Sequence, residues 1–187
     1  MTRLTEDQAA PDFSIIDMEG KTHKLGDYRG QYLLLSFYRY ASCPFCNLRI
    51  SQIIQRADTF KLQGLEILSI FQSPEKKIRQ YVGKQKPPFA IVPDPERKLY
   101  QTYKVETSWM GMLKAMVFGM GDMMKAFSKG FGPGTMEGEK NRLPADFLIG
   151  PDGTIIEAYY GKDIGDHMPF ETIEHALSHP TAVAEPA

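Results

Sequence analysis

The sequence predicts one α/β domain, and three observations lead to this fold class. Continuous apolar runs of strand length alternate along the chain with segments in which apolar residues recur at helical spacing. The chain has 187 residues, a length that suits one domain better than two. Hydrophobic residues form 42% of the chain and charged residues 24%, which is typical of globular proteins with one buried core. We therefore expect a single domain over residues 1–187.

The first predicted elements are strands. Apolar and polar residues alternate within residues 12–25 on both sides of a turn at residues 17–20, which predicts a β-hairpin. Residues 31–37 form a nearly continuous apolar run, as expected of a strand whose two faces are both buried. This segment is therefore predicted to be the central strand of a sheet.

Helices and strands then alternate. Apolar residues recur at helical spacing from Pro44 until Gly64, which predicts one helix directly after the central strand. Asp94 and Pro95 have the residue types favoured at a helix N-cap and first helical position. The predicted order is a helix over 44–64, a strand over 65–71, a helix over 74–84, a strand over 89–92 and a short helix over 95–103.

Residues 107–142 interrupt this alternation and are rich in Met and Gly. Apolar residues from Leu113 to Phe131 lie three or four positions apart, which predicts one inserted amphipathic helix. The Gly- and Pro-rich residues 130–134 cannot continue a helix, and the polar stretch up to Asn141 is expected to be an exposed loop. Because methionine adapts to varied apolar partners, the helix is expected either to pack on its own domain or to bind a partner, including a second copy in a homodimer.

The chain closes with a second hairpin and a helix. Residues 147–149 and 154–159 flank the turn sequence at 150–153, which predicts an antiparallel pair. Residues 169–179 predict a closing helix with an apolar face. Together the elements predict a central mixed sheet of four core strands, an added N-terminal hairpin and flanking helices.

Composition argues against several classes of function. Lys and Arg number 22 and Asp and Glu 23, so the net charge of -1 gives no field that would attract nucleic acid. No apolar run is long enough to span a membrane, and residues 1–10 lack the apolar core of a secretory signal. We therefore expect a cytoplasmic protein without a membrane span. No motif indicates a cofactor.

The two cysteines, Cys43 and Cys46, carry the clearest functional signal. Cys43 is predicted to lie at the N-cap of the helix that starts at Pro44. Unpaired backbone N–H groups and the helix dipole stabilise a thiolate there and lower its pKa. Cys46 follows one turn later, close enough to form a disulfide with Cys43. The spacing therefore favours a redox-active dithiol.

Other interpretations of these residues stay open. The cysteines could be two inert buried thiols, or half of a zinc site, although a zinc site needs four ligands and the four histidines show no ligand spacing relative to the cysteines. Asp166 and His167 are adjacent, which suits a general base, and turn chemistry explains the same two residues.

The residues around the cysteines resemble a known family. Residues 36–46, Ser-Phe-Tyr-Arg-Tyr-Ala-Ser-Cys-Pro-Phe-Cys, are similar to the active-site region of the thioredoxin superfamily. The Ala-Pro-Asp-Phe sequence at residues 10–13 and residues 143–153 extend the similarity to the AhpC/TSA group of peroxiredoxin-like proteins. The resemblance covers residues 11–177 and implies a thioredoxin-like fold of three layers (α/β/α) with a Cys-Pro-Phe-Cys (CPFC) site.

The resemblance also implies roles for individual residues. With Cys46 placed on the peroxidatic cysteine, typical peroxiredoxins have Pro, Thr or Ser, and Arg at the positions of Arg39, Cys43 and Pro144. Thioredoxin-like dithiol proteins instead have two cysteines and a facing cis-proline, and Cys43, Cys46 and Pro144 match those positions. A cis-proline leaves the preceding backbone free to pair with an extended substrate beside the sulfur.

These positions favour thiol–disulfide exchange in an antioxidant or redox-homeostasis role. Cys43 would attack, Cys46 would resolve, and Pro144 would shape the substrate edge. The alternative is a thiol peroxidase in which hydrogen peroxide or an organic hydroperoxide oxidises Cys46 and Cys43 resolves. A second alternative is a redox-sensing binding module whose Met-rich helix docks a partner.

Arg39 and Phe45 complete the expected site as substrate-binding residues. Arg39 could stabilise a thiolate or a peroxide oxygen, and Phe45, between the cysteines, is expected to be exposed at the site. The expected substrate is a protein disulfide or a peroxide. The expected reductant is of the thioredoxin or glutathione type. The Pro44-Phe45 dipeptide resembles glutaredoxin sites, which use glutathione.

Overall fold

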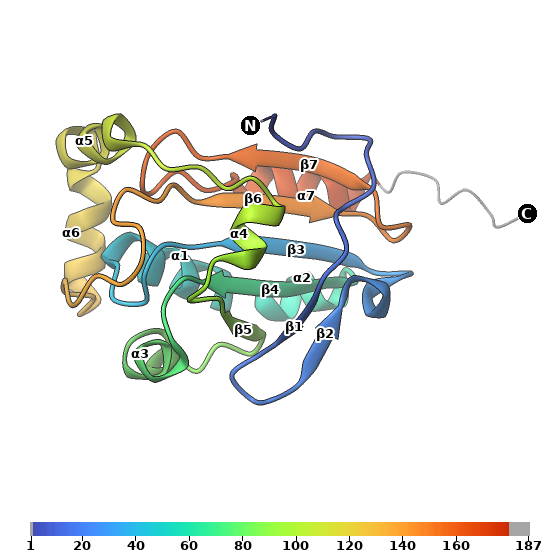
Figure 1. The fold of residues 1–187 in the computed structure, drawn as a ribbon, viewed down its shortest axis with the longest axis horizontal. Helices are drawn as coiled ribbons and strands as arrows, with labels where there is room; N and C mark the ends of the chain where they lie inside the picture. The colour runs from blue at the N-terminus through green and yellow to red at the C-terminus, as the bar shows by residue number, and fades with distance from the viewer. Residues whose placement is uncertain (1, 180–187) are drawn as a thin grey trace, which may run out of the picture.

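A five-stranded mixed sheet forms the centre of the computed structural model, which describes residues 2–179 (Figure 1). The strands are β3 (Tyr32–Phe37), β4 (Leu65–Phe71), β5 (Ala90–Pro93), β6 (Ala145–Ile149) and β7 (Ile155–Tyr160). Their order is β5-β4-β3-β6-β7, with β3 parallel to β4 and antiparallel to β6. The expectation of four core strands is wrong by one strand, because β5 pairs in parallel with β4 and so extends the sheet.

β3 is the central strand, as its apolar run predicts. All six of its residues are buried. Leu34 packs into the core on one face of the sheet, and Leu33 and Leu35 pack into the core on the other face. This alternation is the period of two that a strand imposes on its side chains.

One layer covers each face of the sheet (Figure 1). The first layer contains α1 (Pro44–Ile54), α2 (Ala57–Leu62) and α7 (Phe170–Ser178). The second contains α4 (Lys98–Thr102) and the chain that carries the antiparallel hairpin of β1 (Ser14–Ile16) and β2 (Thr22–Lys24). A short 3-10 helix, η1 (Leu25–Tyr28), follows this hairpin. The predicted N-terminal hairpin and the predicted α/β class are therefore confirmed.

Two of the predicted helices are each divided in the structure. The helix expected from Pro44 to Gly64 becomes α1 and α2, because the chain turns between them and Arg56 N donates to Ile53 O at 2.9 Å. Residues 74–84 form α3 (Glu75–Gln80) and then a 3-10 helix, η2 (Val82–Gln85). Periodicity predicted the helical character of both segments but not these changes of direction.

α4 begins at Lys98, three positions later than predicted. The Asp94 carboxylate accepts hydrogen bonds from the backbone N–H groups of Lys98 and Leu99, at 3.0 and 2.8 Å. Between them the chain makes a turn, in which Arg97 has a φ of 59°. Asp94 therefore satisfies N-terminal N–H groups of the helix, as a cap does, but across an intervening turn.

The Met-rich insertion forms two helices instead of one. α5 (Trp109–Phe118) and α6 (Met120–Ser128) meet at Gly119, and α6 packs beside α1 at one end of the molecule (Figure 1). A Cβ at Gly119 would lie 2.5 Å from the carbonyl oxygen of Ala115, so the sharp junction requires glycine. Only part of the apolar surface packs on the domain, since these large side chains stay exposed: Trp109, Met110, Leu113, Val117, Met120, Met124 and Phe127.

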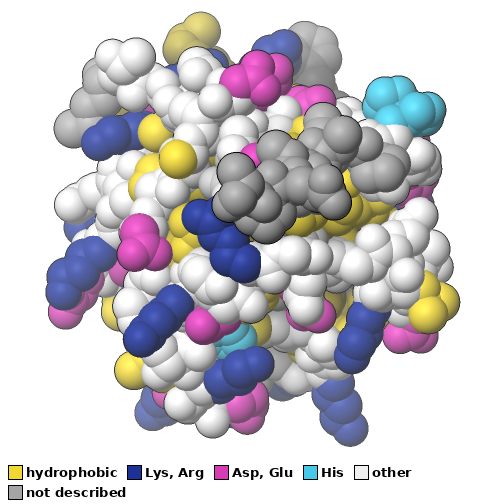
Figure 2. All heavy atoms as spheres, turned by 90° about the vertical axis from the view of Figure 1, so that its right-hand side faces the viewer, with side chains coloured by type: hydrophobic (Ala, Val, Ile, Leu, Met, Phe, Trp, Pro, Cys, Tyr) yellow, Lys and Arg dark blue, Asp and Glu magenta, His cyan; other side chains and the backbone are white. Residues whose placement is uncertain are grey.

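The surface carries charges of both signs. On the face drawn in Figure 2, Lys and Arg side chains are interspersed with Asp and Glu. Within residues 2–179, no helix combines the length and the apolar character that crossing a bilayer requires.

Candidate active site

The two cysteines lie where the central strand gives way to α1. Cys43 is the N-cap residue of this 11-residue helix, and Pro44 occupies its first turn, as predicted. The backbone N–H of Asn47 donates to Cys43 O at 3.0 Å and so closes the first helical turn. Both thiols are free and fully buried. The Cys43 sulfur is therefore placed at the positive end of the helix dipole, away from solvent.

Arg39 is the charged group beside Cys43. Its side chain is buried, and its Nη1 donates to Cys43 Sγ at 3.4 Å. Burial of Cys43 disfavours the thiolate, but the hydrogen bond from Cys46 and the charge of Arg39 outweigh burial and lower the pKa of Cys43 from 9.0 to about 6. Burial and the neighbouring Cys43 raise the pKa of Cys46. Cys43 is therefore the thiol that ionises first.

Asn47 holds the loop that carries the cysteines. Its Nδ2 donates to the carbonyl oxygens of Ala41 and Cys43, at 2.7 and 2.9 Å. Its Oδ1 accepts a hydrogen bond from Gln85 Nε2 at 3.0 Å. Sequence reasoning did not single out Asn47; the signal that could have identified it is a polar residue directly after the CPFC motif.

A segment that we name the strap, residues 130–141, crosses the site. Its backbone carbonyl groups accept hydrogen bonds from buried side chains beneath it: Ser42 donates to Thr135 O at 2.6 Å, and Gln72 donates to Glu139 O at 2.9 Å. Arg39 Nη2 donates to Lys140 O. The expectation of an exposed loop is confirmed, since the segment has no helix or strand and most of its residues are exposed, but its carbonyl groups are tied to the buried side chains beneath it. These contacts join residues that are far apart in the sequence, so local composition could not indicate them.

Phe45 is buried, contrary to the expectation that it is exposed at the site. A Cβ at Gly119 would lie 3.1 Å from its ring, and a Cβ at Gly165 would lie 3.0 Å from it. The ring is therefore enclosed by the α5–α6 junction and by the loop after β7, two segments that meet only in the folded chain.

Pro144 differs from the expected cis-proline. Among the described residues 2–179, no peptide bond is cis. Pro144 is buried, and its carbonyl oxygen accepts a hydrogen bond from Gly161 N at 3.0 Å. The trans form is the ordinary state of an X–Pro bond. Pro144 therefore matches the family's proline in sequence position but not in conformation.

Asp166 and His167 separate into two different roles. The Asp166 carboxylate accepts hydrogen bonds from the Tyr159 hydroxyl and from Lys162 N, at 2.6 and 2.7 Å, which is the turn role. His167 pairs instead with Asp146 of β6, with Nδ1 3.0 Å from Oδ2, and both side chains are buried. Asp146 was missed in the sequence; the signal is one charged residue inside a buried apolar strand.

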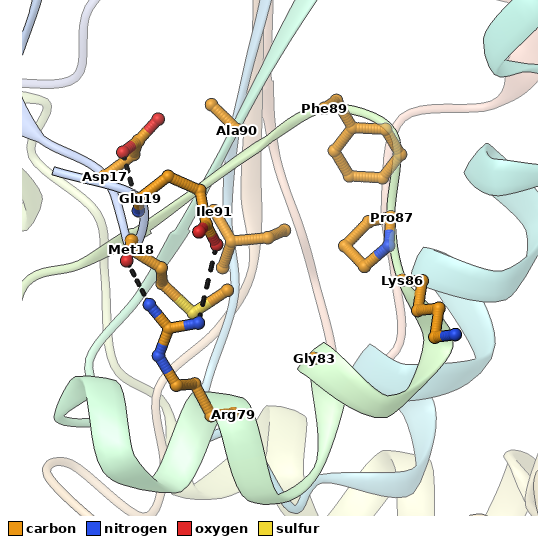
Figure 3. Close-up of a pocket in the computed structure, with 10 residues that line it drawn as sticks. All are labelled: Asp17, Met18, Glu19, Arg79, Gly83, Lys86, Pro87, Phe89, Ala90 and Ile91. Atoms are coloured by element: carbon orange, nitrogen blue, oxygen red, sulfur yellow. Dashed lines mark hydrogen bonds and ion pairs between the residues drawn. The ribbon is translucent and has the colours of Figure 1, made fainter. Parts of the chain in front are cut away.

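A hollow of about 420 Å³ lies away from the cysteines, between the β1–β2 turn, η2 and β5 (Figure 3). Arg79 projects into it, donates to the carbonyl oxygen of Met18 and lies 3.5 Å from the Glu19 carboxylate. Its guanidinium is therefore already paired with protein groups. Within residues 2–179, no group of three or more His, Cys, Asp or Glu side chains is arranged to hold a metal ion.

Known proteins resemble this chain in sequence and in fold. The model of the AhpC/TSA family matches residues 7–158. The chain is 28% identical to "Peroxiredoxin Bcp" of Escherichia coli (strain K12) over 113 residues, which are 59% of this chain and 72% of that protein. Among solved structures, it is similar to peroxidoxin BcpB from Mycobacterium tuberculosis, with a TM-score of 0.66 and 14% identity over 98% of this chain and 100% of that one.

A second solved structure resembles the chain in the same way. It is the thioredoxin domain of thiol-disulfide oxidoreductase BVU-2223 from Bacteroides vulgatus, with a TM-score of 0.56 and 19% identity over 93% of this chain and 99% of that one. At this level of identity the likeness concerns the fold. The chain has the thioredoxin-like fold that its sequence implied.

Proposed function

The chain belongs to the AhpC/TSA family, and from this premise we propose that it is a thiol peroxidase in which Cys43 attacks a hydroperoxide and Cys46 resolves the oxidised product. Arg39, Phe45 and Pro144 complete the proposed site. The observation that carries the proposal is the contact of 3.4 Å between Arg39 Nη1 and Cys43 Sγ. With a pKa of about 6, Cys43 is mostly thiolate at neutral pH, and the thiolate is the form that attacks peroxides.

The proposed reaction has two steps. The Cys43 thiolate attacks one peroxide oxygen, the O–O bond breaks, and the other oxygen leaves with a proton as an alcohol or water. The sulfenic acid of Cys43 is then attacked by the Cys46 sulfur, which forms the S–S bond and breaks the S–O bond, with release of water. An external dithiol or glutathione-type reductant returns the disulfide to two thiols.

Burial of the site supports a hydroperoxide as the oxidising substrate. Both sulfurs are fully buried, the strap contacts Ser42 beside Cys43, and the Phe45 ring is enclosed by the α5–α6 junction and the loop after β7. A hydroperoxide needs a smaller opening than a disulfide on a folded protein. The curated relative described as a peroxiredoxin supports the same choice. The proposal retains Cys43 as the attacking thiol, in contrast to the peroxidase alternative with Cys46 in that role.

Thiol–disulfide exchange is the second candidate. It is supported by the residues of this chain that depart from the peroxiredoxin pattern, namely Arg39, Cys43 and Pro144. In this case the Cys43 thiolate would attack a substrate disulfide and Cys46 would resolve the mixed disulfide, so the two roles stay the same.

The test uses Cys46→Ser and Cys43→Ser, each mixed with stoichiometric hydrogen peroxide and a sulfenic-acid trap, with the site identified by mass spectrometry. We expect fast trapping at Cys43 in Cys46→Ser and slow trapping at Cys46 in Cys43→Ser, because the Arg39 side chain donates to Cys43 Sγ while burial raises the pKa of Cys46. Fast trapping at Cys46 would assign the peroxidatic role to Cys46. Reaction of both thiols at the rate of an ordinary free thiol would leave disulfide exchange as the function.

A further inference from the structure

A row of buried polar side chains crosses the sheet beneath α1. Ser69 of β4 is paired with Ser36 of β3, and Ser36 is paired with Asp146 of β6. All three are fully buried. Residues paired across neighbouring strands project to the same face of a sheet. Leu34, two positions before Ser36, belongs to the core that α1 covers, so the row lies on the α1 side.

Asp146 and His167 form a pair at one end of this row. His167 Nδ1 lies 3.0 Å from Asp146 Oδ2, and Met168 N donates to the same carboxylate oxygen at 2.7 Å. Burial raises the pKa of Asp146, but the charge and hydrogen bond of His167, the charge of Arg49 and the hydrogen bond from Met168 N together lower that pKa below its usual value, so this buried carboxylate stays ionised. The carboxylate thereby fixes the orientation of the imidazole through Nδ1.

The pair lies against the part of α1 that carries Cys46. Cys46 and Arg49 are three positions apart on this helix and so share a side of it. Arg49 Nη2 donates to Met168 O at 2.6 Å, which brings that side of α1 to the residue after His167. The Tyr38 ring lies 4.9 Å from the His167 ring and belongs to the same buried cluster as Cys46.

Two buried polar atoms of this region have free hydrogen-bonding capacity. His167 Nε2 and the Tyr38 hydroxyl are buried and have no hydrogen-bond partner among residues 2–179. A buried polar group without a partner is costly, and such groups recur at sites that have a catalytic role. His167 Nε2 can take a proton there because Nδ1 is already held by Asp146.

We propose that the Asp146–His167 pair receives the proton of Cys46 when the disulfide closes. The inference rests on the proposed function, in which Cys46 attacks the sulfenic acid of Cys43. The Cys46 S–H bond breaks and its proton passes to His167 Nε2. The S–S bond forms, the S–O bond breaks, and the leaving hydroxide takes this proton from His167 Nε2 to become water. A base is needed at this site because both sulfurs are buried away from solvent, so that water cannot remove the proton directly.

Other titratable groups face the pair from each neighbouring element. α1 contributes Arg49 and Cys46, and Tyr38 follows directly after β3. Tyr159 on β7 stands opposite Asp146, but its hydroxyl donates to Asp166 at 2.6 Å. Arg49 is the fixed cation of this set, and it favours the ionised form of Asp146 at every pH of interest.

The experiment separates closure of the disulfide from the reaction of Cys43. Hydrogen peroxide is added to the wild-type protein, to His167→Gln, to Asp146→Asn and to the control His175→Gln, at pH values from about 5 to 9. Samples are quenched at intervals with an alkylating reagent and analysed by intact-protein mass spectrometry. Reduced, sulfenic and disulfide forms are distinguished by mass. His175 is the matched control because it is exposed on α7.

We expect His167→Gln and Asp146→Asn to slow closure at pH 7 by about tenfold or more, with sulfenic acid forming at the wild-type rate. Wild-type closure should reach a plateau on the alkaline side, whereas closure in His167→Gln should keep rising with pH, because hydroxide must then remove the proton. His175→Gln should match the wild type. An unchanged closure rate and pH profile in His167→Gln overturns the inference. It is also overturned if His167→Gln slows formation of the sulfenic acid and closure of the disulfide by the same factor.

Two further arms keep the inference testable. If His167→Gln does not fold, the pH profile of the wild type alone is the test. A closure rate that rises in proportion to hydroxide concentration over the whole pH range, with no plateau, overturns the inference. Methyl methanethiosulfonate places a methylthio group on Cys43, and closure then releases methanethiol without any peroxide. If peroxide does not oxidise Cys43, the proposed function fails, while slower closure of this adduct in His167→Gln still supports the base.

Discussion

Arg39 joins the sulfur of Cys43 to the backbone of Lys140. One terminal nitrogen of its guanidinium lies 3.4 Å from Cys43 Sγ, and the other donates to Lys140 O in the strap. The same side chain therefore stabilises the thiolate and holds the strap over it. The first predictions follow from this contact.

Arg39→Gln should raise the pKa of Cys43, because it removes the cation beside a buried thiolate. With Cys46→Ser as the background, so that one thiol remains, iodoacetamide should alkylate Cys43 at pH 7 about tenfold more slowly in Arg39→Gln. The midpoint of the rate against pH should move upward. Arg97→Gln, which loses a pairing with Glu139 at the surface, is the control and should leave the midpoint in place. A midpoint that does not move in Arg39→Gln would contradict the assignment.

The stability of the reduced protein should depend on pH through Cys43. A folded pKa below the unfolded value contributes stability that is present above the unfolded pKa and is lost as pH falls through the folded pKa of about 6. The free energy of unfolding should therefore rise between about pH 6 and 9, by at most about 1.4 kcal/mol per pH unit. At higher pH the raised pKa of Cys46 opposes any further rise in the free energy of unfolding. Denaturant titrations of the reduced wild type and of Cys43→Ser measure this, and an equal slope in both would exclude Cys43 as the source.

Gly119→Ala should destabilise the protein. A Cβ there would lie 2.5 Å from Ala115 O and 3.1 Å from the Phe45 ring, so the α5–α6 junction or the ring must move. We expect a loss of about 1–3 kcal/mol in the free energy of unfolding. Gly121→Ala is the matched control, since its Cβ meets no atom within 4 Å and alanine favours a helix. Chemical denaturation of both variants is the measurement, and equal effects would show that the junction tolerates a side chain.

Gly134→Val should loosen the strap. A Cβ at Gly134 would lie 2.5 Å from the Tyr81 hydroxyl and 2.8 Å from Ser42 Cβ, so the strap must lift to accommodate it. We expect a bulky maleimide to label Cys43 about tenfold faster than in the wild type, because overpacking at a tight contact forces the backbone to shift. Gly132→Val, whose Cβ meets no atom within 4 Å, should label at the wild-type rate. Equal labelling in Gly134→Val and wild type would show that the strap does not limit access.

Much of the fold was predictable because the relevant signals are local. The buried run of β3, the hairpin of β6 and β7, and the placement of Cys43 before Pro44 follow from residue types within a few positions of one another. Where the prediction was wrong, the deciding contact came from elsewhere in the chain. The continuous helix expected in the insertion breaks at Gly119 because two helices and the Phe45 ring converge there.

The candidate site divides in the same way. The sequence by itself determined which atoms can do the chemistry: two thiols one helical turn apart, with the first at a helix N-terminus. Tertiary structure alone decided their environment, because Arg39 reaches Cys43 only when the loop folds back and Lys140 fixes it from about a hundred positions away. It also decided that His167 pairs with Asp146 and not with its neighbour Asp166. The physical reason is that burial, charge and hydrogen bonding act through space, and sequence separation does not measure that distance.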